Sequence, residues 1–170
     1  IRYASGTSNM LLWNTHNPFR SCLVFDDGHC ILWDYQESNH YVESNYLYID
    51  EVRTGASMFY FAKGDKVKSA AENFSDQVCQ AFKKKGKNTK KLAIDKIMLD
   101  GFKSLENRDF EIENGEKIME HARSIKSGEE IKAMRCSISA CETSMHIMEN
   151  KTKPGMAEND IWSILHSENI

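Results

Sequence analysis

The last third of the chain, residues 123–170, most constrains what the chain can fold into. Ser127 and Glu130 form the pattern of a capping box, in which a Ser hydroxyl and a Glu carboxylate each satisfy a backbone amide at a helix start. Apolar residues then recur at spacings of three and four, which predicts an amphipathic helix of about six turns. This apolar stripe consists of Ile131, Met134, Ile138, Cys141, Met145 and Met148.

A second helix is predicted after a break at Lys153-Pro154-Gly155. Glu158 and Asp160 place negative charge in its first turn, where the helix carries partial positive charge. Ala157 occupies the position of a capping side chain, so the start of this helix relies on Asn159 or on the two acids. The apolar residues of the second helix are Ile161, Trp162, Ile164 and Leu165.

The two helices indicate a domain that begins at residue 123 and is incomplete. Their apolar faces need a partner, and the sequence stops within the second helix. It also begins with Ile1 in place of an initiator Met. We therefore expect a first domain over 1–122, the start of a second domain over 123–170, and an N-terminal fragment of a longer protein.

The first 122 residues predict a layered α/β domain with a mixed sheet and flanking helices. The clearest signal is a hairpin, because the strand-like runs 21–25 and 29–34 flank Asp26-Asp27-Gly28, and an Asp-Gly pair tolerates positive φ in a tight turn. After this hairpin, segments with strand patterns alternate with segments with helix patterns, which is typical of a layered α/β domain. The other expected strands are 1–5, 10–15, 49–53, 58–61, 91–95 and 110–112, and the expected helices are 66–85, 98–105 and 115–122.

Charge and cysteine usage limit the classes of partner. The formal net charge is only -3 and the sequence pI is near 6.1, so no overall field attracts nucleic acid or an anionic membrane. The lysines around Gly86 fit the C-terminal end of a helix better than a nucleic-acid site. Five dispersed cysteines fit a reducing cytoplasm, and no apolar run is long enough to span a membrane. We expect a small molecule or a peptide as the partner.

The 170 residues offer no clear catalytic or metal-binding motif. The six histidines are dispersed, without the i, i+4 spacing of a zinc-binding helix or nearby pairs of cysteines. There is no phosphate-binding glycine loop and no nucleophile elbow. We interpret Asp26, Asp27 and Asp34 as turn and strand-end residues. No catalytic residue and no metal ligand is therefore assigned.

The chain nevertheless resembles a known enzyme family over essentially its whole length. The order of basic lead-in, capped helix, Pro-Gly break and acidic helix start over 123–166 resembles the entry to the catalytic domain of creatinase and Xaa-Pro aminopeptidase, the pita-bread family. Within it, 2–6, Trp13, His16-Asn17-Pro18 and 158–166 resemble the dimethylsulfoniopropionate lyase-like proteins. The resemblance implies a creatinase-type N-terminal domain followed by the first two helices of a truncated pita-bread catalytic domain.

The resemblance also implies a cofactor and an assembly. Family members hold two divalent metal ions (Mn, Fe, Zn or Co) with two Asp, one His and two Glu, and none of these positions falls within 1–170. The two metal ions would polarise a carbonyl group of the substrate and generate hydroxide from bound water near neutral pH. A homodimer is implied as well, in which the first domain packs against the partner's catalytic domain and can lend a residue to the mouth of the pocket.

Four residues are the candidates for substrate binding on this basis: Trp13, His16, Phe19 and Arg20. Family members have a carboxylate-binding Arg after a comparable aromatic segment, and a guanidinium suits this task because its planar fork donates two parallel hydrogen bonds. The alternatives are interdomain packing for Trp13 and Phe19, a turn cap for His16, and a solvated edge position for Arg20.

Three functions remain open from the sequence. The first is a metal-dependent lyase acting on dimethylsulfoniopropionate or a similar small carboxylate. The second is an Xaa-Pro dipeptidase or aminopeptidase. The third is a non-catalytic relative that keeps the fold as a protein-binding module.

Overall fold

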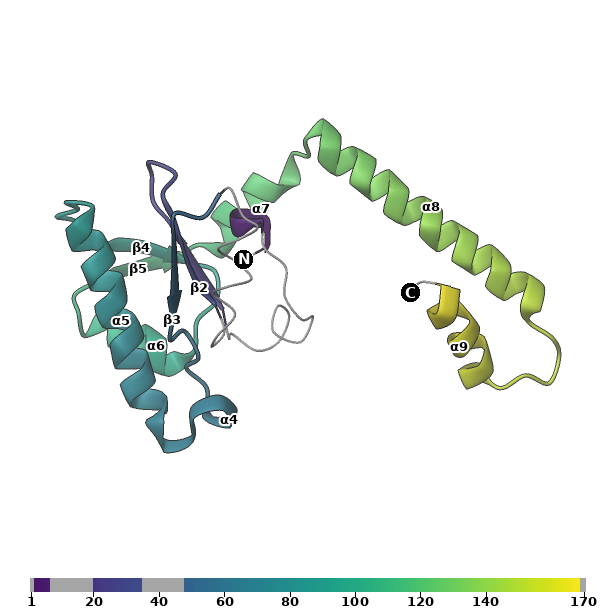
Figure 1. The fold of residues 1–170 in the computed structure, drawn as a ribbon, viewed down its shortest axis with the longest axis horizontal. Helices are drawn as coiled ribbons and strands as arrows, with labels where there is room; N and C mark the ends of the chain where they lie inside the picture. Colours follow the sequence, from purple (N-terminus) through teal and green to yellow (C-terminus); the bar gives the residue numbers. More distant parts are fainter. Residues whose placement is uncertain (1, 7–19, 35–47, 169–170) are drawn as a thin grey trace. The chain divides into compact units, whose positions relative to one another are not determined.

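The computed structural model describes residues 2–6, 20–34 and 48–168, and the chain divides into two compact units, Ile1–His121 and Ala122–Ile170 (Figure 1). The division lies one residue before the boundary expected at 122/123. Helix α7, Glu116–Ser124, runs across it. The identity of the two units as domains of the pita-bread family stays a prediction, and each unit is described by itself.

The first unit contains a small mixed sheet of three strands. Strands β1, Ser21–Val24, and β2, Cys30–Asp34, form the predicted antiparallel hairpin, and β3, Glu51–Thr54, pairs with β2 in parallel. Gly28 takes a φ of 84° in the turn, which a residue with a Cβ rarely adopts. The turn is closed by the amide of Phe25, which donates to the carbonyl of His29 at 2.9 Å.

Helix α5, Val67–Lys84, covers one face of this sheet (Figure 1). Its apolar positions recur at helical spacing and meet the large side chains of β2. The ring centroids of Trp33 and Phe74 lie 5.1 Å apart, and the indole Nε1 of Trp33 donates to Oε1 of Gln77 at 2.7 Å. Phe25 packs on Phe82 in the same core. The predicted helix 66–85 is thus confirmed.

A second, two-stranded parallel sheet completes the first unit. Strands β4, Lys91–Ile94, and β5, Glu111–Asn114, pair in register, and helix α6, Leu99–Glu106, connects them. A parallel pair requires such a crossover connection. The core that contains α5 extends into this region through Phe110 and the fully buried Leu105. At Gly115 a Cβ would lie 2.8 Å from the backbone N of Ile94, so only glycine fits there.

The lysines near the end of α5 bind the hairpin turn. Nζ of Lys85 lies 2.8 Å from Oδ2 of Asp27, and Nζ of Lys87 lies 2.6 Å from Oδ1 of Asp26. These hydrogen bonds lower the pKa of both carboxyl groups. Gly86, with a φ of 64°, ends the helix as its position predicts. Asp26 and Asp27 are therefore turn residues that tie the hairpin to α5.

Two expected strands are wrong. Residues Arg2–Ser5 form the short helix α1, because a short apolar run fits either a strand or a helix. The run 58–61 contributes Met58 and Phe59 to the core without pairing and then enters helix α4, Tyr60–Lys63. Gly55, with a φ of 111°, follows β3 directly and redirects the chain. The expected strand 10–15 lies outside the described residues.

The second unit consists of the end of α7 and of two helices, α8, Gly128–Lys151, and α9, Glu158–Glu168. Both bonds of the capping box are present: Ser127 Oγ accepts from the amide of Glu130 at 3.2 Å, and Glu130 Oε2 accepts from the amide of Ser127 at 2.7 Å. Asp160 Oδ2 accepts a hydrogen bond from the amide of Ala157 at 3.0 Å, so an acidic side chain stabilises the start of α9. Within the described ranges, no helix combines the length and the apolarity needed to cross a membrane.

Candidate functional site: the second face of the hairpin sheet

The register of β1 and β2 separates two sets of side chains. Ser21 pairs with Trp33 and Leu23 with Ile31, and this set faces the core and α5. Because side chains alternate between faces, the intervening residues lie on the opposite face. We call this opposite face the second face; its residues are Arg20, Cys22, Val24, Cys30, Leu32 and Asp34.

The end of the second face at Arg20 and Asp34 is buried although it carries charge, whereas Val24 at the other end is 50% exposed. Arg20 is 2% exposed, and so is Asp34. Nε of Arg20 donates to Oδ1 of Asp34 at 2.9 Å, and Nη2 donates to Oδ2 at 3.1 Å. This is the two-pronged geometry in which a guanidinium meets a carboxylate most strongly. The pair ties the residue before β1 to the last residue of β2.

The structure excludes one reading of Arg20 and leaves its substrate role a prediction. A solvated edge position is wrong, because hairpin pairing brings Arg20 beside Asp34 and buries both side chains. The other three candidates, Trp13, His16 and Phe19, lie outside the described residues. Sequence reasoning missed Asp34 as the partner of Arg20. Extending the hairpin register by one residue beyond the Ser21 and Trp33 pair would have placed the two opposite each other.

Two cysteines meet on the same face. Cys22 and Cys30 are diagonal neighbours across β1 and β2, and their Sγ atoms lie 3.4 Å apart. The hydrogen bond between the two thiols, with burial, raises the pKa of Cys22, and the same bond lowers the pKa of Cys30. Loss of a proton is therefore favoured at Cys30 over Cys22. No spacing rule in the sequence signals this pair, since only the hairpin register brings it together.

A cavity of about 610 Å³ borders Cys30. Tyr3 and Gly6 line it from α1 and its end, and Cys30, Tyr48 and Asp50 line it from β2 and the segment before β3. Oδ2 of Asp50 accepts from the amide of Cys30 at 2.8 Å and lies 3.5 Å from Nδ1 of His29. Polar groups thus converge at the end of the second face away from Arg20.

The described residues do not supply a metal centre. Across 2–6, 20–34 and 48–168, no group of three or more His, Cys, Asp and Glu side chains could hold a metal ion. The cysteine pair with Asp50 and His29 does not form such a group. The pair of metal ions implied by the family resemblance therefore does not fit the residues described, and no chemical step is derived through it.

No family model matches the chain. It is 47% identical over its whole length to a protein of Roseobacter denitrificans named dimethylsulfoniopropionate lyase DddP, and 46% identical to a protein of the same name from Roseovarius nubinhibens. Each alignment covers 100% of the chain and 39% of the relative. The chain thus spans about two fifths of the length of these two relatives, and all of it is similar to proteins named as dimethylsulfoniopropionate lyases.

Proposed function

We propose that the chain is the N-terminal part of a metal-dependent enzyme of the creatinase and aminopeptidase family that acts as a lyase on dimethylsulfoniopropionate. One observation carries this proposal: 47% identity, over the whole of this chain, to a protein named for that activity. The mixed α/β first unit and the capped helix pair agree with the order of elements implied by the family resemblance. The same proposal includes a homodimer located in the cytoplasm.

In this proposal the metal ions are bound outside the residues described here. The divalent ions would supply Lewis-acid stabilisation of developing negative charge when bound. The contribution of this chain is different, because its first unit offers a rigid sheet rather than a ligand cluster. That sheet holds Arg20 at a fixed place directly after the segment that contains Trp13, His16 and Phe19.

We further propose that Arg20 helps to bind the carboxylate of the substrate, with Trp13, His16 and Phe19 near it. The two hydrogen bonds that Arg20 donates to Asp34 fix the plane of the guanidinium, which limits the entropy lost when a further partner binds. Asp34 is then a positioning residue. Its role is to hold Arg20 in one orientation.

The activity is tested with the whole protein that contains this segment. The purified protein, supplied in turn with manganese, iron and zinc, is offered dimethylsulfoniopropionate and a Gly-Pro dipeptide. We expect release of dimethyl sulfide without cleavage of the dipeptide. Proline release alone would assign a peptidase. The absence of both products together with the absence of bound metal would assign a protein-binding module.

The role of Arg20 is tested by Arg20→Lys in the same protein. Lysine keeps the charge beside Asp34 but loses the planar fork, so we expect a raised KM for the carboxylate substrate. Arg53→Lys is the matched control, because Arg53 also pairs with a carboxylate, Glu51 at 2.8 Å, but lies on the face toward α5. Equal changes in KM for both variants would assign Arg20 a structural role only.

A further inference from the structure

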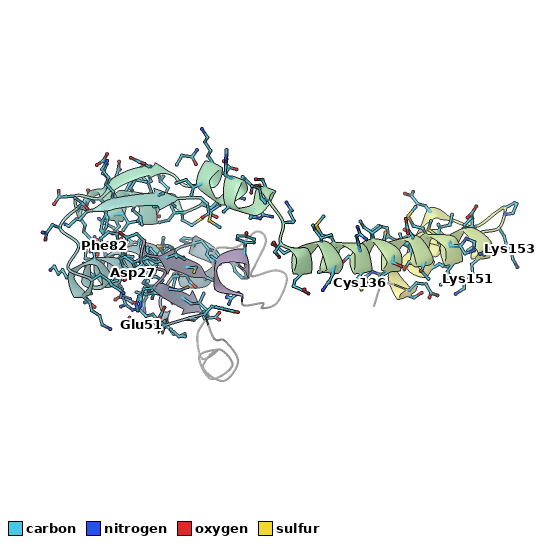
Figure 2. All side chains as sticks on the ribbon, turned by 90° about the horizontal axis from the view of Figure 1, so that it is seen from above. Asp27, Glu51, Phe82, Cys136, Lys151 and Lys153 are labelled. Atoms are coloured by element: carbon cyan, nitrogen blue, oxygen red, sulfur yellow. The ribbon has the colours of Figure 1, made fainter. Side chains whose placement is uncertain are left out.

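The two cysteines of the second face are placed for chemistry that is separate from the proposed lyase activity. The Sγ atoms of Cys22 and Cys30 lie 3.4 Å apart, which is the distance of two thiols in direct contact. Diagonal positions on adjacent antiparallel strands bring them together, so the contact is built into the register of the hairpin. The other free cysteines of the chain are Cys79, Cys136 and Cys141, and the last two are exposed on α8. Figure 2 labels Cys136 on this helix.

The surroundings distinguish the two thiols. The two thiols share one hydrogen bond, and this contact lowers the pKa of Cys30 while it raises the pKa of Cys22. The nearby carboxylate of Asp50 opposes this effect, because like charges repel, but the direct hydrogen bond is the larger influence. The thiolate is the reactive form of cysteine. Cys30 is therefore the nucleophile of the pair, and Cys22 is the resolving thiol.

A route for a small oxidant leads to Cys30. Cys30 is only 3% exposed, yet it lines the cavity of about 610 Å³ that Tyr3, Tyr48 and Asp50 also line. A cavity of this size admits a molecule as small as a peroxide. A small oxidant can therefore reach Cys30 through this cavity.

We propose that Cys22 and Cys30 are a site of reversible oxidation, at which a small hydroperoxide converts the two thiols to a disulfide across β1 and β2. The thiolate of Cys30 attacks one peroxide oxygen, the O–O bond breaks, and the leaving oxygen departs as water or an alcohol after taking a proton. Cys30 is then a sulfenic acid. The sulfur of Cys22 attacks it, the S–S bond forms, the S–O bond breaks, and the hydroxyl leaves as water with the proton of Cys22.

Disulfide formation requires the two sulfur atoms to come closer than they are in the reduced pair. In a disulfide the two sulfur atoms are bonded at a distance of about 2.05 Å. The two sulfur atoms start from a contact at 3.4 Å and must therefore move closer by about 1.3 Å. A small thiol or dithiol reverses the bond by thiol–disulfide exchange.

The site is tested by treating the folded chain with a small molar excess of hydrogen peroxide. We expect the loss of two hydrogen atoms in the intact mass, three of the five thiols still open to alkylation after unfolding, and a reducible peptide that links Cys22 to Cys30. Cys136 and Cys141 serve as internal controls, because both are exposed and five residues apart on one helix. Oxidation of these two while Cys22 and Cys30 remain free thiols would overturn the proposal.

Two variants separate the roles of the thiols. In Cys22→Ser the sulfenic acid of Cys30 has no thiol to close on, so dimedone should label Cys30. In Cys30→Ser dimedone should not label Cys22. The reverse labelling would overturn the assignment of the nucleophile. Circular dichroism checks that both variants fold, and the peptide map of the unaltered chain decides the proposal on its own if either does not.

Discussion

The two units of the chain hold their apolar residues in opposite ways. In the first unit Trp33 is fully buried against α5, with Ile31, Met58 and Leu105 buried around it. In the second unit Trp162 is 68% exposed, and the stripe residues Met134 and Ile138 of α8 are about half exposed. Among its described side chains only that of Ser144 is buried.

Local signals and tertiary packing act separately in the two units. The second unit has well-formed helix starts, and Lys151 and Glu168 join its helices by an ion pair of 2.9 Å. Capping and exposed ion pairs each contribute little, whereas the burial of large apolar side chains contributes most of the stability of a domain. The first unit therefore has a core of its own, whereas Ile131, Met134, Ile138 and Met145 of the α8 stripe are each about half exposed.

The largest contrast is expected between the two tryptophans. Trp33→Ala should lower the free energy of unfolding by about 3 to 5 kcal/mol, because it leaves a cavity and removes the hydrogen bond to Gln77. Trp162→Ala, at an exposed site, should change it by less than about 1 kcal/mol. Urea denaturation followed by circular dichroism measures both. Similar losses for the two variants would remove the contrast between the units.

The second largest loss of stability is expected when the buried ion pair of Arg20 and Asp34 is broken. Asp34→Asn leaves the charge of Arg20 buried without its carboxylate, which should cost about 3 kcal/mol in the same denaturation experiment. The matched control is Asp76→Asn, because Asp76 pairs with Arg108 at 2.7 Å but at the surface. Its effect should be much smaller. A stability loss at Asp76 as large as that at Asp34 would show that burial does not set the difference.

The capping box should have a smaller and local effect. Ser127→Ala removes the acceptor of the Glu130 amide and should destabilise the start of α8 by about 1 kcal/mol. Hydrogen exchange of the amides in the first turn measures this directly. Ser137→Ala, in the middle of the same helix, is the control, because its hydroxyl only bonds back to Ala133 O. Faster exchange in the control than in the cap variant would contradict the role of the cap.

The smallest effect is the acid dependence of that cap. The hydrogen bond from the Ser127 amide lowers the pKa of Glu130 below its usual 4.5 in the folded chain. A depressed carboxyl pKa adds stability above the unfolded value, and this contribution is lost as the pH falls through the folded value. The helicity of α8 should therefore decline more between about pH 5 and pH 3 in the unaltered chain than in Glu130→Gln. Parallel titration curves would show that Glu130 is not the responsible group.

The sequence predicted those parts of the fold that rest on local patterns. The hairpin follows from Asp26-Asp27-Gly28, α5 from its apolar spacing, and the start of α8 from Ser127 and Glu130. The run 58–61 was misread as a strand because its residues are apolar, as strand residues often are. Whether such a run pairs is decided by the chain direction after Gly55, which is a tertiary property.

The candidate site was predictable only in part. Arg20 was singled out from a family resemblance, but its partner Asp34 and the contact of Cys22 with Cys30 depend on the pairing of residues far apart in the sequence. An alternating strand pattern tells which residues share a face of one strand. Residues on two strands can be assigned to one site only when the register between the strands is known.

The central claim is that the first unit is held by its own core while the helices of the second unit are held mainly by local interactions. Native-state hydrogen exchange of the 170-residue chain tests it most directly. The account predicts that amides of β2 and α5 exchange most slowly, and that those of α8 and α9 exchange many times faster. Protection of α8 and α9 equal to that of β2 and α5 would contradict it.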